Sequence, residues 1–361
     1  MAADGTGHQH PLRRRPGAKE PGEILRHSLG HIARGSEGAL FFQWRQSRAG
    51  AETWHSAMLP HAGPDSRIFR EVTRTGEAVA QLGELAGSTV TAQVAVLDDP
   101  DAMWALEADG LPSARLGYQA PLAGAHRALW DAGVTADFAH PEHELSGYRL
   151  VIAPSLFLLS DKKAENLRRY VEGGGTLLVQ HASGGFVDER MHARLGGYPA
   201  GPLREALGIR VEEHRPLRTD ERITLSDGSH GTVWSESLRV EGAETLAAAT
   251  YTHGMLTGSP ALTRHRSGSG QGWYLSTRLD DADYAALVGR LLKEAGVEPE
   301  VPGLSAGVEA VARHAPDGRR WQVLLNHTSE AVPLPEPAHD LLTDALVHEL
   351  PPGGCAVLRG L

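Results

Sequence analysis

The stretch Ser160-Asp-Lys-Lys-Ala-Glu-Asn-Leu-Arg-Arg-Tyr-Val-Glu-Gly-Gly-Gly-Thr-Leu-Leu-Val-Gln180 carries the pattern on which the fold depends. The side-chain oxygens of Ser160 and Asp161 can accept hydrogen bonds from the free N–H groups that begin a helix. The segment 161–172 predicts that helix, and the glycines at 173–175 end it. The apolar run 176–180 then predicts a strand buried on both faces. A helix followed directly by a buried strand indicates an α/β fold with a parallel sheet.

The same alternation continues on both sides of this stretch. Before it, we predict a helix at 116–132 and strands at 90–97, 134–138 and 150–153. After it, a last helix at 281–295 follows apolar segments at 203–207, 246–250 and 273–276. The sequence therefore predicts a doubly wound α/β domain over residues 87–297.

The two ends of the chain differ from this central part. Short β segments at 308–314, 322–326 and 356–358, separated by turn formers, predict a small antiparallel β domain over 298–361. At the other end, residues 1–22 read as loop or disorder, and helices are expected at 23–34 and 66–85. Between those helices the apolar run 39–44 reads as a buried strand. Residues 1–86 amount to about one and a half α/β repeats, too little for a domain.

The composition limits the function. The chain has 361 residues, enough for two or three domains, with 41% hydrophobic and 22% charged residues. A net charge of -10 argues against a general nucleic-acid binder. One cysteine, Cys355, excludes a disulfide framework or a cysteine-based zinc site within this chain. We expect a cytoplasmic protein that binds no membrane, because neither a signal-peptide core nor an apolar run of roughly 20 residues is found.

A polar pair, Glu52 and His55, follows the apolar run 39–44. If the loop is helical there, the carboxylate and the imidazole project from one face of the helix and could bind a ligand with hydroxyl groups. The aromatic rings of Phe42, Trp44 and Trp54 could cover the CH edges of a sugar. More often, however, such a polar pair is simply exposed to solvent on a helix turn. Such aromatic residues are more often part of the hydrophobic core.

Two other motifs have structural interpretations that outweigh the functional ones. His181-Ala-Ser183-Gly-Gly follows the strand 176–180, where a serine nucleophile would sit, but the leading glycine of that motif is replaced by His181. A cysteine nucleophile is excluded at this position, because Cys355 lies in the last β segment. Histidine pairs such as His8 and His10, or the Glu142-His143-Glu144 run, lack a second ligand cluster at metal spacing. We expect neither a metal nor a cofactor.

Spaced motifs are found along nearly the whole chain from about residue 20: Pro21-Gly22-Glu23, Arg26-His27-Ser28-Leu29, Phe41-Phe42-Gln43-Trp44-Arg45-Gln46-Ser47, His55-Ser56-Ala57-Met58-Leu59-Pro60-His61, Gly196-Gly197-Tyr198-Pro199, Pro202-Leu203-Arg204-Glu205, Trp273-Tyr274-Leu275-Ser276-Thr277, Leu325-Asn326-His327 and Leu350-Pro351-Pro352. Together they resemble the C-terminal portion of glycoside hydrolase family 42 β-galactosidases. The resemblance implies that 1–86 is the remnant of a (β/α)8 catalytic barrel, that 87–297 is a flavodoxin-like trimerisation domain, and that 298–361 is a small β-sandwich. It also implies a galactoside ligand and a homotrimer.

The resemblance gives roles to three residues. It implies that Glu52 and His55 hold galactose hydroxyls and that Phe42 lines the sugar pocket. Members of the family are retaining enzymes with two catalytic glutamates, which must lie about 5 Å apart. Both precede the part of the family that this chain resembles. We therefore expect a truncated gene or a mis-assigned start, and no glycosidase activity of the chain alone.

Two alternatives remain open at this stage. The first is a non-catalytic assembly module in which the α/β domain self-associates and the barrel remnant is disordered. The second is a flavodoxin-like domain that binds a small molecule.

Overall fold

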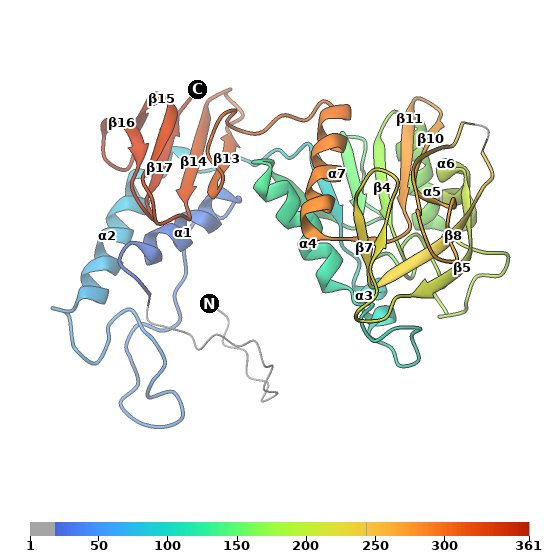
Figure 1. Ribbon diagram of the computed structural model, residues 1–361. Helices are drawn as coiled ribbons and strands as arrows, with labels where there is room; N and C mark the ends of the chain where they lie inside the picture. Colours follow the sequence, from blue (N-terminus) through green and yellow to red (C-terminus); the bar gives the residue numbers. More distant parts are fainter. Residues whose placement is uncertain (1–18, 243, 361) are drawn as a thin grey trace. The chain divides into compact units, whose positions relative to one another are not determined.

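The computed structural model describes residues 19–242 and 244–360, in two compact units. One unit is Ala92–Pro299, and the other joins the described parts of Met1–Thr91 and Glu300–Leu361 (Figure 1). The fold is mixed α/β, with one largely parallel sheet and several antiparallel ones. The described part of the chain contains no helix with the length and apolar character needed to cross a membrane.

The central unit is built on a seven-stranded sheet, with the strand order β2-β1-β3-β4-β11-β10-β9. In that order the strands are Ala136–Ala139, Val94–Leu97, Leu150–Ala153, Thr176–Gln180, Gly270–Leu275, Pro260–Ser267 and Leu246–Thr250. The first five run parallel, and β10 and β9 are antiparallel additions at one edge. Strands β1, β3 and β4 are buried along their whole length, because helices cover both faces.

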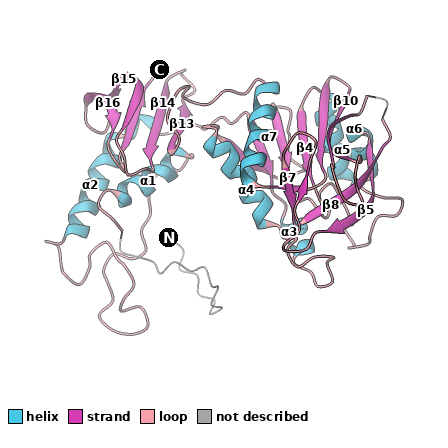
Figure 2. Ribbon diagram, viewed as in Figure 1, coloured by secondary structure: helices cyan, strands magenta, loops and turns pink. Residues whose placement is uncertain are grey.

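The helices of this unit form one pair on each face of the sheet (Figure 2). The pair α4 and α7 comprises Gln119–Asp131 and Asp281–Glu294, and the pair α5 and α6 comprises Asp161–Glu172 and Gly201–Leu207. The helix and strand predicted from 161–180 are confirmed with the same bounds. Ser160 is the cap, since its Oγ accepts a hydrogen bond from the N–H of Lys163 at 3.1 Å. A short helix after β1, α3 at Pro100–Leu106, was not predicted.

A second β layer of the central unit was also missed. Strands β5, Ile209–Pro216, and β8, Trp234–Val240, form an antiparallel pair. A three-stranded sheet lies nearby, made of β12, β7 and β6 at Arg278–Leu279, His230–Thr232 and Ile223–Thr224. Three of the eight residues of β5 are exposed and polar, so its apolar signal is weak.

The other unit combines both ends of the chain. Its five strands have the order β13-β14-β17-β15-β16, at Val308–His314, Arg320–Asn326, Cys355–Arg359, Val332–Asp340 and Ala345–Leu350. Strand β15 joins β17 through one residue pair, Asp340 and Leu358. A core that includes Leu324, Leu334 and Leu350 is formed between β13-β14-β17 and β15-β16. The β segments expected in this region are thus confirmed, with two further strands.

Of the two N-terminal helices, the first packs on this β structure and the second packs on the first. They are α1, Glu23–Ala33, and α2, Arg67–Gln81, which is followed by the 3-10 helix η1 at Gly83–Leu85. Apolar side chains of α1 and of the segment 79–85 share a core with β13, β14 and β17: Leu29, Ile32, Leu82, Leu85, Val311, Trp321, Val323, Leu325 and Val357. The alternative in which this N-terminal part is disordered is therefore wrong for α1 and α2.

The predicted buried strand at 39–44 is also wrong. Leu40, Phe42 and Trp44 are exposed, and the nearest pairing is one isolated bridge between Arg45 and Leu59. The physical reason is that a buried strand needs sheet neighbours on both sides. The described part of this unit offers none to the run 39–44.

Candidate functional site

The segment between α1 and α2 closes into a loop, which we call loop 39–61. The N–H groups of Met58 and Leu59 donate to the carbonyls of Gln43 and Trp44, at 3.0 and 2.8 Å. The N–H of Gln46 donates to the carbonyl of Leu59 at 3.0 Å. These bonds form a neck, and residues 47–57 project beyond it.

Glu52 and His55 lie on a turn in this projecting part, and no helix forms there. The N–H of Thr53 donates to the carbonyl of Gly50 at 3.2 Å, and the N–H of His55 donates to that of Glu52 at 3.0 Å. Glu52 is exposed and His55 is half-buried. Both can reach a ligand from solvent, and their contact with a sugar stays a prediction.

The aromatic residues of the loop are exposed, which is contrary to the more frequent expectation of a place in the core. The exposed fractions are 79% for Phe42, 59% for Trp44 and 84% for Trp54. Two of the rings have a fixed edge contact. Trp44 meets Phe69 with ring centroids 6.0 Å apart, and Trp54 meets His61 at 5.9 Å. Edge-to-face contacts of this kind orient both rings, and each covers one face of only one of the two rings.

The turn that begins with His181 is a structural element and offers no nucleophile. Ser183 is fully buried, its hydroxyl donates to the carbonyl of Ala153 at 2.9 Å, and it accepts from the N–H of Leu156 at 2.9 Å. Burial, aided by the charge of Arg278, lowers the pKa of His181 to about 3. Cys355 lies in β17 as expected, and burial raises the pKa of its thiol to about 12. A solvent-borne substrate therefore meets no activated nucleophile at these residues.

Sequence reasoning missed the buried carboxyl group of Glu236 on β8. Its Oε1 accepts from the N–H of Ala182 at 2.9 Å and from the indole N–H of Trp234 at 2.7 Å. Its Oε2 accepts from the hydroxyl of Tyr274 at 2.8 Å. Burial raises the pKa of Glu236 to about 7, and the three donors oppose that shift. Through these hydrogen bonds the carboxyl group links the turn, β8 and β11. Because it is fully buried, it does not contact substrate.

The carboxyl ends of β1 and β3 are where open α/β sheets bind small molecules. Here Asp99 is fully buried, and its Oδ2 pairs with Nζ of Lys163 at 2.7 Å. The hydroxyl of Tyr118 donates to Asp98 at 2.5 Å and accepts from the N–H of Asp99 at 2.6 Å. These groups satisfy one another, which weighs against the small-molecule alternative.

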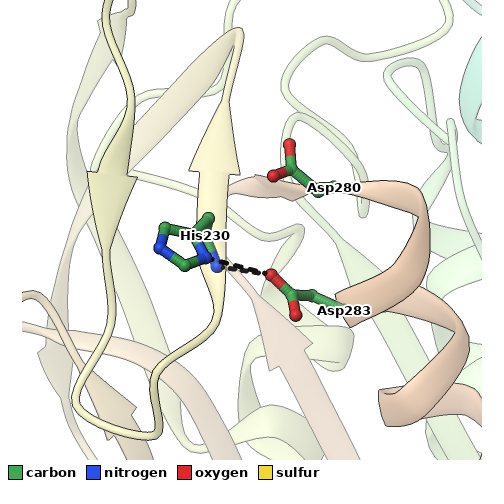
Figure 3. Close-up of side chains that lie close together, drawn as sticks. All are labelled: His230, Asp280 and Asp283. Atoms are coloured by element: carbon green, nitrogen blue, oxygen red, sulfur yellow. Dashed lines mark hydrogen bonds and ion pairs between the residues drawn. The ribbon is translucent and has the colours of Figure 1, made fainter.

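One cluster of the described residues has the composition of a metal site: His230, Asp280 and Asp283 (Figure 3). The potential ligand atoms lie within 4.8 Å of one another. However, Asp283 accepts from the backbone N–H of His230 at 2.8 Å, and Asp280 is paired with Arg222. Both carboxylates thus already have protein partners, a backbone N–H for Asp283 and a guanidinium for Asp280. His8 and His10 lie outside the described residues.

Comparison with known proteins gives one consistent result. Residues 92–298 match a family model described as the β-galactosidase trimerisation domain, residues 5–82 match the β-galactosidase model, and residues 307–360 match the β-galactosidase C-terminal domain. A β-galactosidase from Arthrobacter sp. is 44% identical over 325 residues, which are 90% of this chain and 46% of that protein. The β-galactosidase BgaB from Geobacillus sp. is 37% identical over 349 residues, 95% of this chain and 51% of that protein.

Solved structures agree with these matches. The β-galactosidase from Bacillus circulans sp. alkalophilus has a TM-score of 0.90 and 30% identity, over 97% of this chain and 54% of that one. The enzyme from Rahnella sp. R3 has a TM-score of 0.88 and 30% identity, over 97% and 53%. The chain thus spans about half the length of the curated relatives it matches. Because 207 central residues (92–298) match a model of this family and the fold agrees with its solved structures, the chain belongs to glycoside hydrolase family 42.

Proposed function

We propose that this chain supplies the assembly part and one wall of the galactoside site of a family 42 β-galactosidase, and that it does not hydrolyse galactosides by itself. The observation that carries the proposal is the match of residues 92–298 to a model described as a trimerisation domain. This match covers the central unit almost completely, so self-association is the activity that the chain is best equipped to perform.

The finer domain assignment is part of the proposal. Residues 87–297 form a flavodoxin-like domain, which is supported by the strand order β2-β1-β3-β4-β11, since that fold has the order 2-1-3-4-5. Residues 298–361 form a β-sandwich, supported by the core between β13-β14-β17 and β15-β16. Residues 1–86 are the end of a (β/α)8 barrel, supported by the match of 5–82 to the β-galactosidase model.

The sugar contacts come from loop 39–61. Glu52 accepts hydrogen bonds from galactose hydroxyls, His55 donates or accepts one through its imidazole, and Phe42 offers its ring to the apolar side of the sugar. The exposure of Glu52 and Phe42 supports this role, because both are free to face a ligand. The net charge of -10 supports a protein that is not a general nucleic-acid binder, and the single cysteine supports a place in the cytoplasm.

The purified chain should not release nitrophenol from an aryl β-galactoside above the rate of a buffer blank. Retaining hydrolysis needs two carboxyl groups about 5 Å apart on opposite sides of the glycosidic bond. Glu52 lies on an exposed turn, and its proposed partner group is the imidazole of His55. Measurable hydrolysis that disappears in the Glu52→Ala variant would show that the chain is catalytically complete, and would overturn this part of the proposal.

The same chain should be a homotrimer at micromolar concentration, with a mass by light scattering of about three times 38.7 kDa. Light scattering together with tryptophan fluorescence separates the two candidate functions. A trimer without any effect of galactose or lactose on its tryptophan fluorescence favours the non-catalytic assembly module. A monomer over the whole accessible concentration range would contradict both.

A further inference from the structure

The turn that carries Glu52 and His55 has only local polar bonds. Besides the backbone bonds that form the turn, the hydroxyl of Thr53 donates to the carbonyl of Gly50 at 2.6 Å. In the described part of the chain, no hydrogen bond or ion pair joins residues 48–57 to any other segment. The turn is therefore ordered within itself, and its direction relative to the neck of the loop depends on other contacts.

Such a contact is made by His61, at the end of the loop. Its backbone N–H donates to Oε1 of Gln46 at 2.9 Å, and its Nε2 lies 2.7 Å from the carbonyl oxygen of Ser47. Because a carbonyl oxygen only accepts, Nε2 carries the proton and donates it. The same imidazole meets Trp54, with the ring centroids 5.9 Å apart and the ring planes at 79°. His61 is thus held at two points beside the neck and presents its ring to the turn.

Trp54 is the residue through which this ring acts on the turn. It stands between Glu52 and His55 in the chain and is 84% exposed, so most of its indole remains uncovered. Aromatic pairs of this geometry favour one arrangement over its alternatives by a factor of about 2 to 10. A contact of this strength does not fold a domain, but it is enough to decide the direction of a short turn.

We propose that His61 is a positioning residue of the galactoside site, which orients Trp54 and, through it, the turn with Glu52 and His55. Sugars are bound by polar side chains that meet the hydroxyls from fixed directions, together with aromatic rings that cover the CH groups. A turn that is already held by His61 loses less conformational freedom when the sugar binds than a turn that is free to move. This inference rests on the proposed function and adds the residue that orients the two hydroxyl-binding side chains.

The test uses the full chain labelled with 5-fluorotryptophan and followed by fluorine NMR. The signal of Trp54 is one of seven and is assigned by its absence in Trp54→Phe. Methyl β-D-galactoside is added at millimolar concentrations, and the shift of this signal gives the dissociation constant. We expect His61→Ala to raise that constant about two- to tenfold. His348→Ala is the control, because His348 is an exposed histidine on β16, outside the loop, and this variant should bind like the unchanged chain.

Two further variants separate the positioning of Trp54 from a purely structural role beside the neck. His61→Phe keeps an aromatic ring for Trp54 but no donor for the carbonyl of Ser47, so it should retain most of the binding. His61→Gln keeps an N–H donor for that carbonyl but no ring, so it should bind as weakly as His61→Ala. Rescue by glutamine and not by phenylalanine would overturn the inference, because His61 would then act only through its hydrogen bond to Ser47.

The outcomes also distinguish this inference from the proposed function. If the unchanged chain binds the galactoside and His61→Ala binds it equally well, the inference fails while the proposed sugar contacts stand. If the Trp54 signal of the unchanged chain does not respond to the galactoside, the sugar contacts of loop 39–61 and the inference fail together, and a trimer by light scattering would leave only the assembly function. Signals of the tryptophans outside the loop should keep their positions in every variant, which establishes that each variant is folded.

Discussion

Replacing Arg313 with alanine should destabilise the unit formed by the two ends of the chain by about 3 to 5 kcal/mol. Arg313 is 1% exposed and bridges α1 to the β structure. Its guanidinium donates to the carbonyl of Ile32, and its Nη2 donates to the carbonyl of Ser88 at 2.7 Å. The alanine variant leaves both carbonyls without these donors and a cavity beside them. Each of those defects costs about 1 to 3 kcal/mol.

Hydrogen exchange measured by mass spectrometry can report on this unit separately, through peptides from β13 and β14. Faster exchange confined to these peptides and to α1 is expected, with residues 92–299 unchanged. Arg70→Ala is the control, since Arg70 forms an exposed ion pair with Asp65 and surface pairs contribute about 0 to 1 kcal/mol. Exchange in Arg313→Ala that equals that of the control would mean that the hydrogen bonds of Arg313 do not stabilise the packing of α1 on the β structure.

The elements that the sequence predicted correctly are those whose signals are local. The helix Asp161–Glu172 and the strand Thr176–Gln180 have a cap, a glycine stop and an apolar run within 21 consecutive residues. Such signals act through neighbouring backbone groups, so they need no knowledge of the rest of the fold. Strand β13 was predicted for the same reason, because six of its seven residues are buried.

The elements that were missed depend on contacts between distant segments. Strand β5 contains Glu212, Glu213 and His214 in a row, and it is a strand because β8 pairs with it. The run 39–44 shows the opposite error, since its composition suits a buried strand but its neighbours are missing. Burial of a charged group is equally non-local. Nothing in the sequence around Arg313 or Glu236 distinguishes these residues from exposed ones.

The sequence predicted which residues make up the candidate site but not their backbone conformation. Glu52, His55 and Phe42 do lie on one loop, and two of them are well exposed. The sequence suggested that Glu52 and His55 share a helix face, whereas the structure places them on a turn. A spacing of three residues brings side chains together only when the backbone is helical. Their joint action on a galactoside therefore stays a prediction.

Changing Glu236 should alter both the stability of the central unit and its dependence on pH. The pKa of this carboxyl group is raised from 4.5 to about 7 by burial. The folded protein thus binds the proton more tightly than the unfolded chain does. The stabilising contribution of the protonated group is fully present below pH 4.5 and is lost as the pH rises through about 7. The difference between the pKa values of 4.5 and about 7 corresponds to roughly 3 kcal/mol in the free energy of unfolding.

His181 acts in the opposite direction over part of the same range. Its pKa is lowered from 6.5 to about 3, so the folded protein favours the neutral imidazole and gains stability as the pH rises from about 3 to 6.5. The pH profile of the unchanged protein therefore contains two opposing contributions. The difference between this profile and that of a Glu236 variant isolates the carboxyl group, because His181 is present in both.

Glu236→Gln and Glu236→Ala should have opposite effects above pH 7. The glutamine oxygen can keep the hydrogen bonds from Ala182 and Trp234, and its NH₂ group can donate to the hydroxyl of Tyr274 after that hydroxyl rotates. This variant should equal or exceed the unchanged protein in stability at pH 8. Alanine leaves three donors without this acceptor and opens a cavity, so it should cost about 3 kcal/mol or more.

Urea unfolding at pH 5, 6, 7 and 8 tests both variants, with Glu213→Gln on the exposed part of β5 as the control. Subtracting the profile of Glu236→Gln from that of the unchanged protein should leave a difference that shifts in favour of the glutamine variant between pH 5 and 8. A profile parallel to that of the unchanged protein would show that Glu236 does not change its protonation in this range. In that case the three donors, rather than burial, determine its charge, and the carboxylate is ionised throughout.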